Sequence, residues 1–235
     1  MGIITIQKIN ANPAMGNYSL KNAVFEIRDQ GNNLVDTVTI PDESGIGTSR
    51  ILPLGVYRVT EKSSPPTGGF VRNTNTFTVT LTGSQGTAAI VYSPVCVVPE
   101  TPQVARINIE KYNANPAIGD YSLKNTVFEV FYPDGSLADT VFVDELGKGQ
   151  SKDLPLGKGY KVIEKTASYG FTRNKNTFTV DLNYGGEDVS IIYETVRVPE
   201  FPQTGQIKVY KYNSAPEYGI YDLVCLSIKK CSVWR

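Results

Sequence analysis

The sequence contains no histidine, which removes the commonest general base and the commonest zinc ligand found in proteins. Its three cysteines, Cys96, Cys225 and Cys231, form no paired CxxC motif, and their odd number argues against a disulfide framework. Motifs for phosphate or dinucleotide binding are absent as well, because the glycines occur singly in turn-like segments. We therefore expect that the chain is not an enzyme and has no metal or cofactor site. A hydrolase without histidine or a metal cluster would have to depend on carboxylates alone.

Charge of one sign is not in excess either, because 23 basic residues balance 23 acidic ones. This balance removes a general electrostatic reason to bind nucleic acid or an anionic membrane. No hydrophobic run approaches the length of a bilayer crossing, so we expect no membrane span in this chain. The N-terminal sequence MGIITIQK leads directly into strand-like sequence and lacks the basic region and apolar core of a secretion signal.

The composition that remains is typical of β-structure. The chain contains 14 Tyr, 21 Gly and 14 Pro together with many Thr and Val, and no segment has a convincing helical period. Short alternating segments such as AVFEI, VYRVTEK and NTFTVTL are separated by turn-like segments such as DQGNN and TGSQG. Strands of this length at this spacing predict an all-β fold of tandem immunoglobulin-like sandwiches.

The tandem arrangement follows from internal repetition. NANPAMGNYSLKNAVFEI, which starts at Asn10, returns at Asn113 with few changes, and LPLGVYRVTEK from Leu52 returns at Leu154. The copies predict two complete sandwiches, at residues 1–97 and 104–198. Each is about 100 residues long, which is enough for a core of its own.

A third repeat begins after the second copy and occupies residues 205–235, with Lys211 at the position of the first-strand lysine. Its likeness to the other copies stops early. We expect the tail after about Leu223 to be poorly packed, because one strand cannot make a core.

Proline-containing segments separate the repeats, VVPETPQ from Val97 and VPEFPQTG from Val198. Proline interrupts strand pairing and stiffens a connection. We therefore expect two short, semi-rigid linkers and an extended row of domains.

Each repeat places a lysine on the apolar side of its first strand. Alternate residues of a strand face the same side, so Lys8 in ITIQKIN and Lys111 in INIEKYN are each in phase with two isoleucines. Glu61 and Glu164 are likewise in phase with the apolar residues of VYRVTEK and of its copy. Because a lone buried charge costs several kcal/mol, we expect the lysine and the glutamate of each repeat to meet.

Two interpretations of these pairs are open. In the first, each pair is a buried ion pair, or lies at the rim of the sandwich where the charged ends reach water. In the second, the desolvated lysine is a nucleophile that attacks a side-chain amide, while the carboxyl group polarises the carbonyl and carries the proton. If the amide belongs to asparagine, ammonia leaves and an intramolecular isopeptide bond remains.

The segments LKNAVFEI and LPLGVYRVTEK, with the first-strand lysine, resemble the SpaA-type, prealbumin-like (Cna B-type) domains of Gram-positive surface proteins and pilins. The resemblance covers both complete repeats and the start of the third. It implies stalk or spacer modules of an extracellular, cell-wall-anchored adhesin or pilin. It also implies that Lys8 and Lys111 are isopeptide nucleophiles and that Glu61 and Glu164 handle the proton.

The resemblance further implies an asparagine, less often an aspartate, in the last strand of each repeat. The segments AAIVYSPV and VSIIYETV offer neither, because Ser93 and Pro94 stand there in the first repeat and Glu194 and Thr195 in the second.

Asn75 and Asn176 are the alternative acceptors for an isopeptide bond. FPQTG at Phe201 is similar to the LPxTG sorting signal, but a new strand follows it, so we interpret it as a linker. The loops NPAMGNYSLKN and NPAIGDYSLKN, each with an exposed tyrosine, are too poor in carboxylates for a calcium site and are interpreted as ordinary loops. Cys96 is expected to be partly buried and inert.

Two functions are compatible with this sequence. The near-identity of the copies favours a spacer, since duplication lengthens a rod at little cost. The alternative is a binding module for host extracellular matrix protein or glycan, or for other surface-protein subunits. Exposed aromatic residues gathered on one unit would favour binding, whereas an even distribution would favour the spacer.

Overall fold

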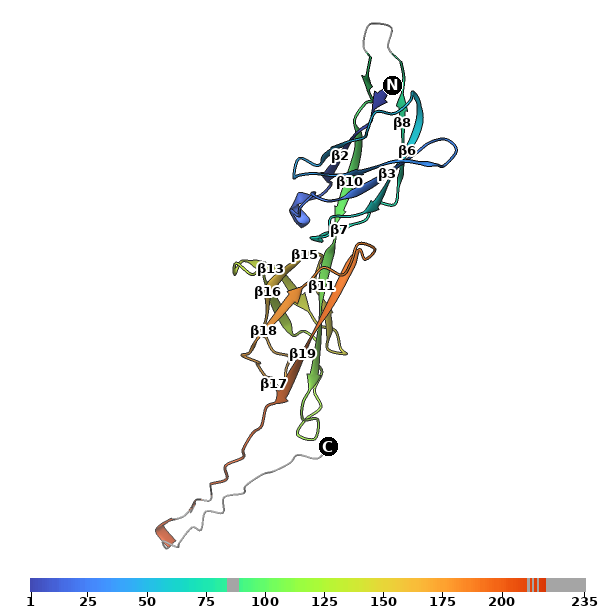
Figure 1. Cartoon of the computed structure of the whole chain (residues 1–235). Helices are drawn as coiled ribbons and strands as arrows, with labels where there is room; N and C mark the ends of the chain where they lie inside the picture. The colour runs from blue at the N-terminus through green and yellow to red at the C-terminus, as the bar shows by residue number, and fades with distance from the viewer. Residues whose placement is uncertain (84–88, 211, 213, 215, 219–235) are drawn as a thin grey trace.

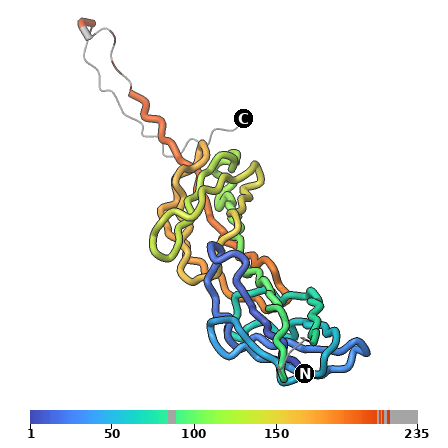
Figure 2. The backbone as a smooth tube through the Cα atoms, turned by 90° about the horizontal axis from the view of Figure 1, so that it is seen from above, coloured from blue at the N-terminus to red at the C-terminus, as the bar shows by residue number. Residues whose placement is uncertain are grey.

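The computed structural model describes residues 1–83, 89–210, 212, 214 and 216–218. It consists of two β-sandwich units stacked end to end, which make an elongated molecule (Figure 1). A view turned by 90° shows the same order of the units along the long axis (Figure 2). We refer to residues 1–102 as the first unit and to residues 104–202 as the second unit. The expected all-β fold of tandem sandwiches is confirmed.

Each unit contains two facing sheets. In the first unit the strands are β1 (Gly2–Ile3), β2 (Thr5–Asn10), β3 (Val24–Arg28), β4 (Leu34–Thr39), β5 (Ile46–Thr48), β6 (Gly55–Ser63), β7 (Phe70–Val71), β8 (Thr76–Leu81), β9 (Val91–Tyr92) and β10 (Cys96–Pro102), with a 3-10 turn η1 at Pro13–Met15. The sheets have the orders β4-β3-β6-β8 and β5-β2-β10-β7, and β1 pairs with β9.

The second unit repeats this plan. Its strands are β11 (Val104–Asn113), β12 (Val127–Phe131), β13 (Leu137–Phe142), β14 (Lys148–Gln150), β15 (Leu154–Pro155), β16 (Gly157–Thr166), β17 (Phe171–Thr172), β18 (Thr177–Leu182) and β19 (Ile191–Pro202). The sheets have the orders β13-β12-β16-β18 and β14-β11-β19-β17, with β15 also paired to β11. A second 3-10 turn, η2 (Pro216–Tyr218), lies outside both units.

Each unit has a core of its own, because strand alternation directs one set of side chains between its two sheets. In the first unit Ile4, Ile6, Phe25 and Val59 are completely buried, and the equivalent positions of the second unit form a separate cluster. The inward phase that the sequence predicts for the first strand is therefore confirmed.

The segments expected to be linkers are strands, and this prediction was wrong. β10 runs through VVPETP to Pro102, β11 begins at Val104, and only Gln103 lies between them, so that the two strands follow one line through the molecule (Figure 1). β19 likewise continues to Pro202. Proline is tolerated here because β10 pairs along its length only with β2, and β19 only with β11. On the other side, β10 meets β7 and β19 meets β17 at two residues each. The expected unit ends at residues 97 and 198 thus fall inside strands.

The third repeat is described only in part. Residues 203–210 form no strand. Lys211 and the tail after Leu223, for which the sequence predicts poor packing, lie outside the described residues.

A glycine turn presses against each first-strand lysine. Gly45 has φ +69, and a Cβ atom built on it would lie 2.2 Å from the carbonyl oxygen of Lys8. Gly147 repeats the arrangement against Lys111, with φ +74 and the same 2.2 Å. Both the left-handed backbone and the close approach require glycine, and the turn fixes the lysine backbone from outside the sandwich.

Candidate functional site: two buried lysine–glutamate–glutamate triads

Both first-strand lysines lie inside the sandwiches. Lys8 is 0% exposed and Lys111 is 2% exposed. β2 carries Lys8 and pairs in parallel with β10, where its partner is Val98; β11 carries Lys111 and pairs in the same way with Val198 of β19. The lysine therefore projects from the central ladder of one sheet towards the opposite sheet.

In the first unit the lysine meets two carboxyl groups. Lys8 Nζ donates a hydrogen bond of 2.7 Å to Oε1 of Glu61, which comes from β6 of the opposite sheet. Oε2 of Glu100, two residues beyond Val98 on β10, lies 2.7 Å from the same nitrogen. The rings of Phe25 and Phe70 lie 6.0 and 5.6 Å from Nζ and close the site with apolar surface. The predicted meeting of Lys8 and Glu61 inside the sandwich is what the structure contains.

Glu61 and Glu100 differ in their hydrogen bonding. Glu61 Oε2 accepts a hydrogen bond of 2.6 Å from the backbone nitrogen of Asn73. Neither side-chain oxygen of Glu100 has a hydrogen-bond partner, although both are buried. Lys8 thus approaches Glu100 at hydrogen-bond length but not in a hydrogen-bond direction.

Burial raises the pKa of the Glu100 carboxyl group to about 8; the charge of Lys8 opposes this shift and that of Glu61 adds to it. At neutral pH Glu100 is therefore mostly protonated. The Lys8 ammonium and the Glu61 carboxylate then carry the opposite charges, and the triad as a whole is neutral.

The second unit repeats the triad with longer distances. Lys111 Nζ lies 3.3 Å from Oε1 of Glu164 and 3.4 Å from Oε2 of Glu200, and burial raises the pKa of Glu200 to about 7. The lysine also donates to the hydroxyls of Thr126, at 2.5 Å, and Ser168, at 3.1 Å. The first unit has no hydroxyl at the position of Thr126, because Ala23 stands there. Lys111 Nζ consequently donates hydrogen bonds to three side chains and lies beside Glu200, whereas Lys8 donates to Glu61 and lies beside Glu100.

The third member of each triad was not found from the sequence. At the last-strand position that the resemblance implies, Ser93 accepts a hydrogen bond from the backbone of Thr5, and the alternative acceptors Asn75 and Asn176 are exposed and lie outside the strands. The residues that do face the lysines are Glu100 and Glu200. A signal existed, since VPE occurs at the end of both repeats with its glutamate in phase with a buried valine.

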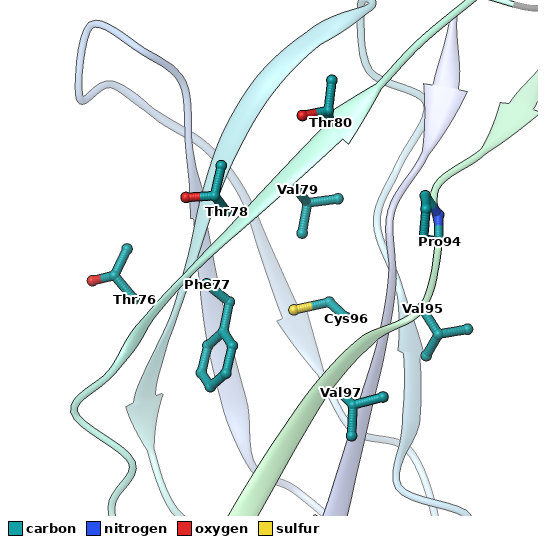
Figure 3. A pocket seen from close by; sticks show the side chains of 9 residues that line it. All are labelled: Thr76, Phe77, Thr78, Val79, Thr80, Pro94, Val95, Cys96 and Val97. Atoms are coloured by element: carbon teal, nitrogen blue, oxygen red, sulfur yellow. The ribbon is translucent and has the colours of Figure 1, made fainter.

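Cys96 lies beside a shallow groove between β8 and the segment before β10. Thr76, Thr78 and Thr80 line one wall, and the apolar side chains of Val95 and Val97 lie along the other (Figure 3). Burial raises the pKa of the Cys96 thiol to about 11, so the thiol stays protonated. The groove therefore offers no activated nucleophile.

The asparagine-rich loops use their polar groups internally. The side-chain nitrogen of Asn10 donates to the carbonyl of Gly16, and that of Asn113 donates to the carbonyl of Gly119. Within the described part of the chain, no group of three His, Cys, Asp or Glu side chains is arranged to hold a metal ion. Among the same residues, no helix is long and apolar enough to cross a membrane.

Comparison with known proteins gives the following matches. The family model described as "SpaA: Prealbumin-like fold domain" matches residues 2–93 and 105–195, more than half of the chain. The Bacillus anthracis TIE protein is 26% identical with a TM-score of 0.62, over 86% of this chain and 34% of that one. The minor pilin GBS52 of Streptococcus agalactiae is 13% identical with a TM-score of 0.37, over 90% of this chain and 100% of that one. BcpA, the major pilin subunit of Bacillus cereus, is 10% identical with a TM-score of 0.34, over 86% of this chain and 99% of that one.

The chain therefore spans about a third of the length of the TIE protein that it matches. A search of the curated proteins finds no match.

Proposed function

Because the chain belongs to the SpaA family of prealbumin-like domains over both of its units, we propose that it is a load-bearing spacer of a Gram-positive cell-surface protein of the pilin or adhesin type. In this role the two sandwiches hold a further domain away from the cell wall. The partners would be other surface-protein subunits, and no catalytic activity on an external substrate is proposed.

The strand pairing supports this proposal. In each unit the first and last strands pair in parallel, from Ile6–Cys96 to Asn10–Glu100 in the first unit. The chain enters at the start of one strand and leaves at the end of the other. A pull on the two ends therefore loads the hydrogen bonds of this ladder along the strands and all together, not one after another.

The triad ties the same two strands together, and this is the observation that carries the proposal. Lys8 belongs to the first strand and Glu100 to the last, with 2.7 Å between their side-chain atoms. A link at this point would take the load before the ladder of hydrogen bonds is sheared.

We propose further that in the first unit this link becomes covalent, with Glu100 in the acceptor role for which the sequence offers no asparagine. The Lys8 ammonium gives one proton to the Glu61 carboxylate. The resulting amine attacks the Cδ atom of the protonated Glu100 carboxyl group, and the C–OH bond breaks. One water leaves with a proton from the lysine nitrogen, and an amide between Lys8 and Glu100 remains beside a protonated Glu61.

The apolar surroundings favour this step, because they disfavour charge on Glu100 and exclude the water that would reverse the condensation. Lys111 is less suited, since the hydroxyls of Thr126 and Ser168 hold its ammonium and Glu200 is 3.4 Å away. We therefore expect the bond to form more completely in the first unit than in the second.

Intact-protein mass spectrometry tests the covalent link. We expect the first unit to lack the mass of one water, and mapping of proteolytic fragments to join the peptide of Lys8 to that of Glu100. Lys8→Met restores the full mass, and Thr126→Ala increases the water loss in the second unit. An unshifted mass at both units contradicts the covalent link and leaves the ion pairs as the only tie between the strands.

Single-molecule pulling tests the spacer role. We expect the first unit to resist extension at forces that unfold its Lys8→Met variant. Equal unfolding forces for the two proteins would refute the load-bearing role of the triad.

One observation favours a binding role in addition. Among the described residues, Tyr92 is the only exposed aromatic side chain of the first unit, whereas the second unit has six. These six are Tyr112, Tyr121, Phe142, Tyr169, Tyr193 and Phe201. The uneven distribution supports a partner-binding surface on the second unit.

A further inference from the structure

The two units are joined by a hydrogen-bonded junction at Gln103. This side chain is 0% exposed, and its Nε2 donates to the carbonyl oxygens of Gly186, at 3.0 Å, and of Val189. Its Oε1 accepts a hydrogen bond of 2.8 Å from the backbone nitrogen of Gly185. Its own backbone nitrogen donates to Gly69 of the first unit. We call the end of the first unit that carries Gly69 its lower end. One glutamine thus ties this lower end to the loop between β18 and β19.

Charged groups reinforce the junction. Arg72 of the first unit forms a 2.6 Å ion pair with Asp188, and its backbone nitrogen donates to the carbonyl of Glu187 at 2.7 Å. The Glu187 carboxylate accepts a hydrogen bond of 2.8 Å from the backbone of Ser64. The acidic end of the loop therefore meets a basic side chain and free backbone donors.

Two tyrosines complete the junction between the units. The hydroxyl of Tyr18 accepts a hydrogen bond of 3.0 Å from the backbone of Leu156 in the second unit. Tyr184 returns the contact, because its hydroxyl donates to the carbonyl of Phe70 at 3.3 Å. Polar contacts on both sides of Gln103 hold the two units in one orientation.

The lower end of the second unit carries the same set of residues. Tyr121, Phe171, Arg173 and Gln203 stand in the places of Tyr18, Phe70, Arg72 and Gln103.

The geometry is also the same. The rings of Tyr121 and Phe171 meet edge to face at 5.8 Å and 89°, as those of Tyr18 and Phe70 do at 5.6 Å and 87°. The backbone of Gln203 donates to Gly170 at 2.8 Å, the length of the bond between Gln103 and Gly69. The difference is exposure, because Gln103 is buried whereas Gln203 and Arg173 are exposed.

We propose that this lower end is a docking surface for the loop end of another SpaA-type unit, set in the orientation that the second unit takes against the first. The occupant would present glycine backbone groups to Gln203 and an acidic side chain to Arg173, as Gly185, Gly186 and Asp188 do in the second unit. The proposal names the partner of the proposed spacer and rests on that function, but it does not depend on the covalent link.

The surface departs from the upper junction at one place. The loop before Phe171 is two residues shorter than that before Phe70; its serine, Ser168, is buried and accepts a hydrogen bond from Lys111, and its Tyr169 is 91% exposed. Tyr169 lies 6.5 Å from Tyr121, edge to face. At this point the docked unit would pack against an aromatic pair in place of the hydrogen bond from Ser64.

The test extends the chain by one unit. Residues 204–235 are replaced by a second copy of residues 104–203, so that Gln203 is followed as Gln103 is. Solution scattering and NMR relaxation then compare the orientation and tumbling of the added unit with those of the first two. We expect one rigid rod, with the backbone amides of the added glycine loop protected from hydrogen exchange.

Gln203→Ala and Arg173→Ala are the test variants, and Lys175→Ala, at an exposed position of the same end, is the matched control. We expect Gln203→Ala to accelerate exchange in the added loop by roughly tenfold, the effect of losing a buried hydrogen bond, and the control to leave it unchanged. Arg173→Ala should accelerate it less, because the equivalent pair of Arg72 with Asp188 is exposed to solvent. Independent tumbling of the added unit, or equal exchange in all three variants, overturns the docking proposal. Neither result would change the loss of water from the first unit or the force that unfolds it, because both depend on the triad inside that unit and not on the contact between units.

Discussion

The charge balance of the first triad can be tested by removing both acids and then the lysine. Glu61→Gln alone is a weak perturbation, because Glu100 can ionise and replace the missing carboxylate. In the double variant Glu61→Gln/Glu100→Gln no negative charge remains for the fully buried Lys8. The triple variant adds Lys8→Met and removes the stranded ammonium as well.

The expected magnitude follows from burial. An ammonium that has lost its partners in a protein interior destabilises the fold by about 3–5 kcal/mol, whereas replacement of the whole charged group by apolar or neutral side chains is close to neutral. We therefore expect the triple variant to exceed the double variant by about 3–5 kcal/mol in the free energy of unfolding of the first unit. For a domain of this size the difference corresponds to roughly 15–30 °C in Tm.

Differential scanning calorimetry of the whole chain measures the difference, with the unaltered second unit as an internal reference. Neither variant retains both Glu61 and an acidic acceptor, so we expect neither to be crosslinked, which intact mass would report. The corresponding double variant of the second unit, Glu164→Gln/Glu200→Gln, is the matched control. It should lose less, because Thr126 and Ser168 still accept hydrogen bonds from Lys111. A difference below about 1 kcal/mol between the double and triple variants would refute the reasoning, since Lys8 would then have to reach water.

Three further predictions concern single groups. Without the covalent link, Glu100 contributes stability that is fully present below pH 4.5 and is lost as the pH rises to about 8, because the folded chain keeps a proton on Glu100 that the unfolded chain releases; the difference between denaturant titrations of the chain and of its Glu100→Gln variant should change with pH across this range, and a constant difference would contradict the raised pKa. Cys96, whose pKa is raised to about 11, should react with iodoacetamide only after unfolding, as peptide mapping would report; rapid labelling of the native chain would contradict its burial. Gly45→Ala should cost more than the roughly 1–2 kcal/mol of a left-handed alanine, because its Cβ would meet the Lys8 carbonyl at 2.2 Å, whereas Gly135→Ala, at φ +88 with open space around it, should cost no more than that; equal losses in thermal melts would refute the clash.

The fold could be predicted because its signals are local. Alternation in ITIQKIN and VYRVTEK states which side of each strand is buried, and the same period places Lys8 and Glu61 inside. The duplication then gives two units with separate cores. These properties depend on neighbours along the chain, and the structure agrees with them.

The third member of each triad could not be placed in the same way, because proline misdirected the strand assignment. Pro99 and Pro102 flank Glu100, and proline normally interrupts a ladder, so the sequence predicts a linker there. In the sheet, β10 pairs along its length only with β2, and its other side meets β7 at Thr101 and Pro102 alone. Which side of a strand is free of a partner is a property of the assembled sheet, and the sequence does not state it.

Tyr18 shows the same dependence on the assembled molecule. The sequence predicts an exposed tyrosine in both asparagine-rich loops, and the loops are nearly identical. Tyr121, in the second loop, is indeed 38% exposed. Tyr18 is half-buried, because the second unit stands against it and Leu156 donates a hydrogen bond to its hydroxyl. The same local sequence therefore has two environments, because the second unit covers the loop of the first unit at Tyr18.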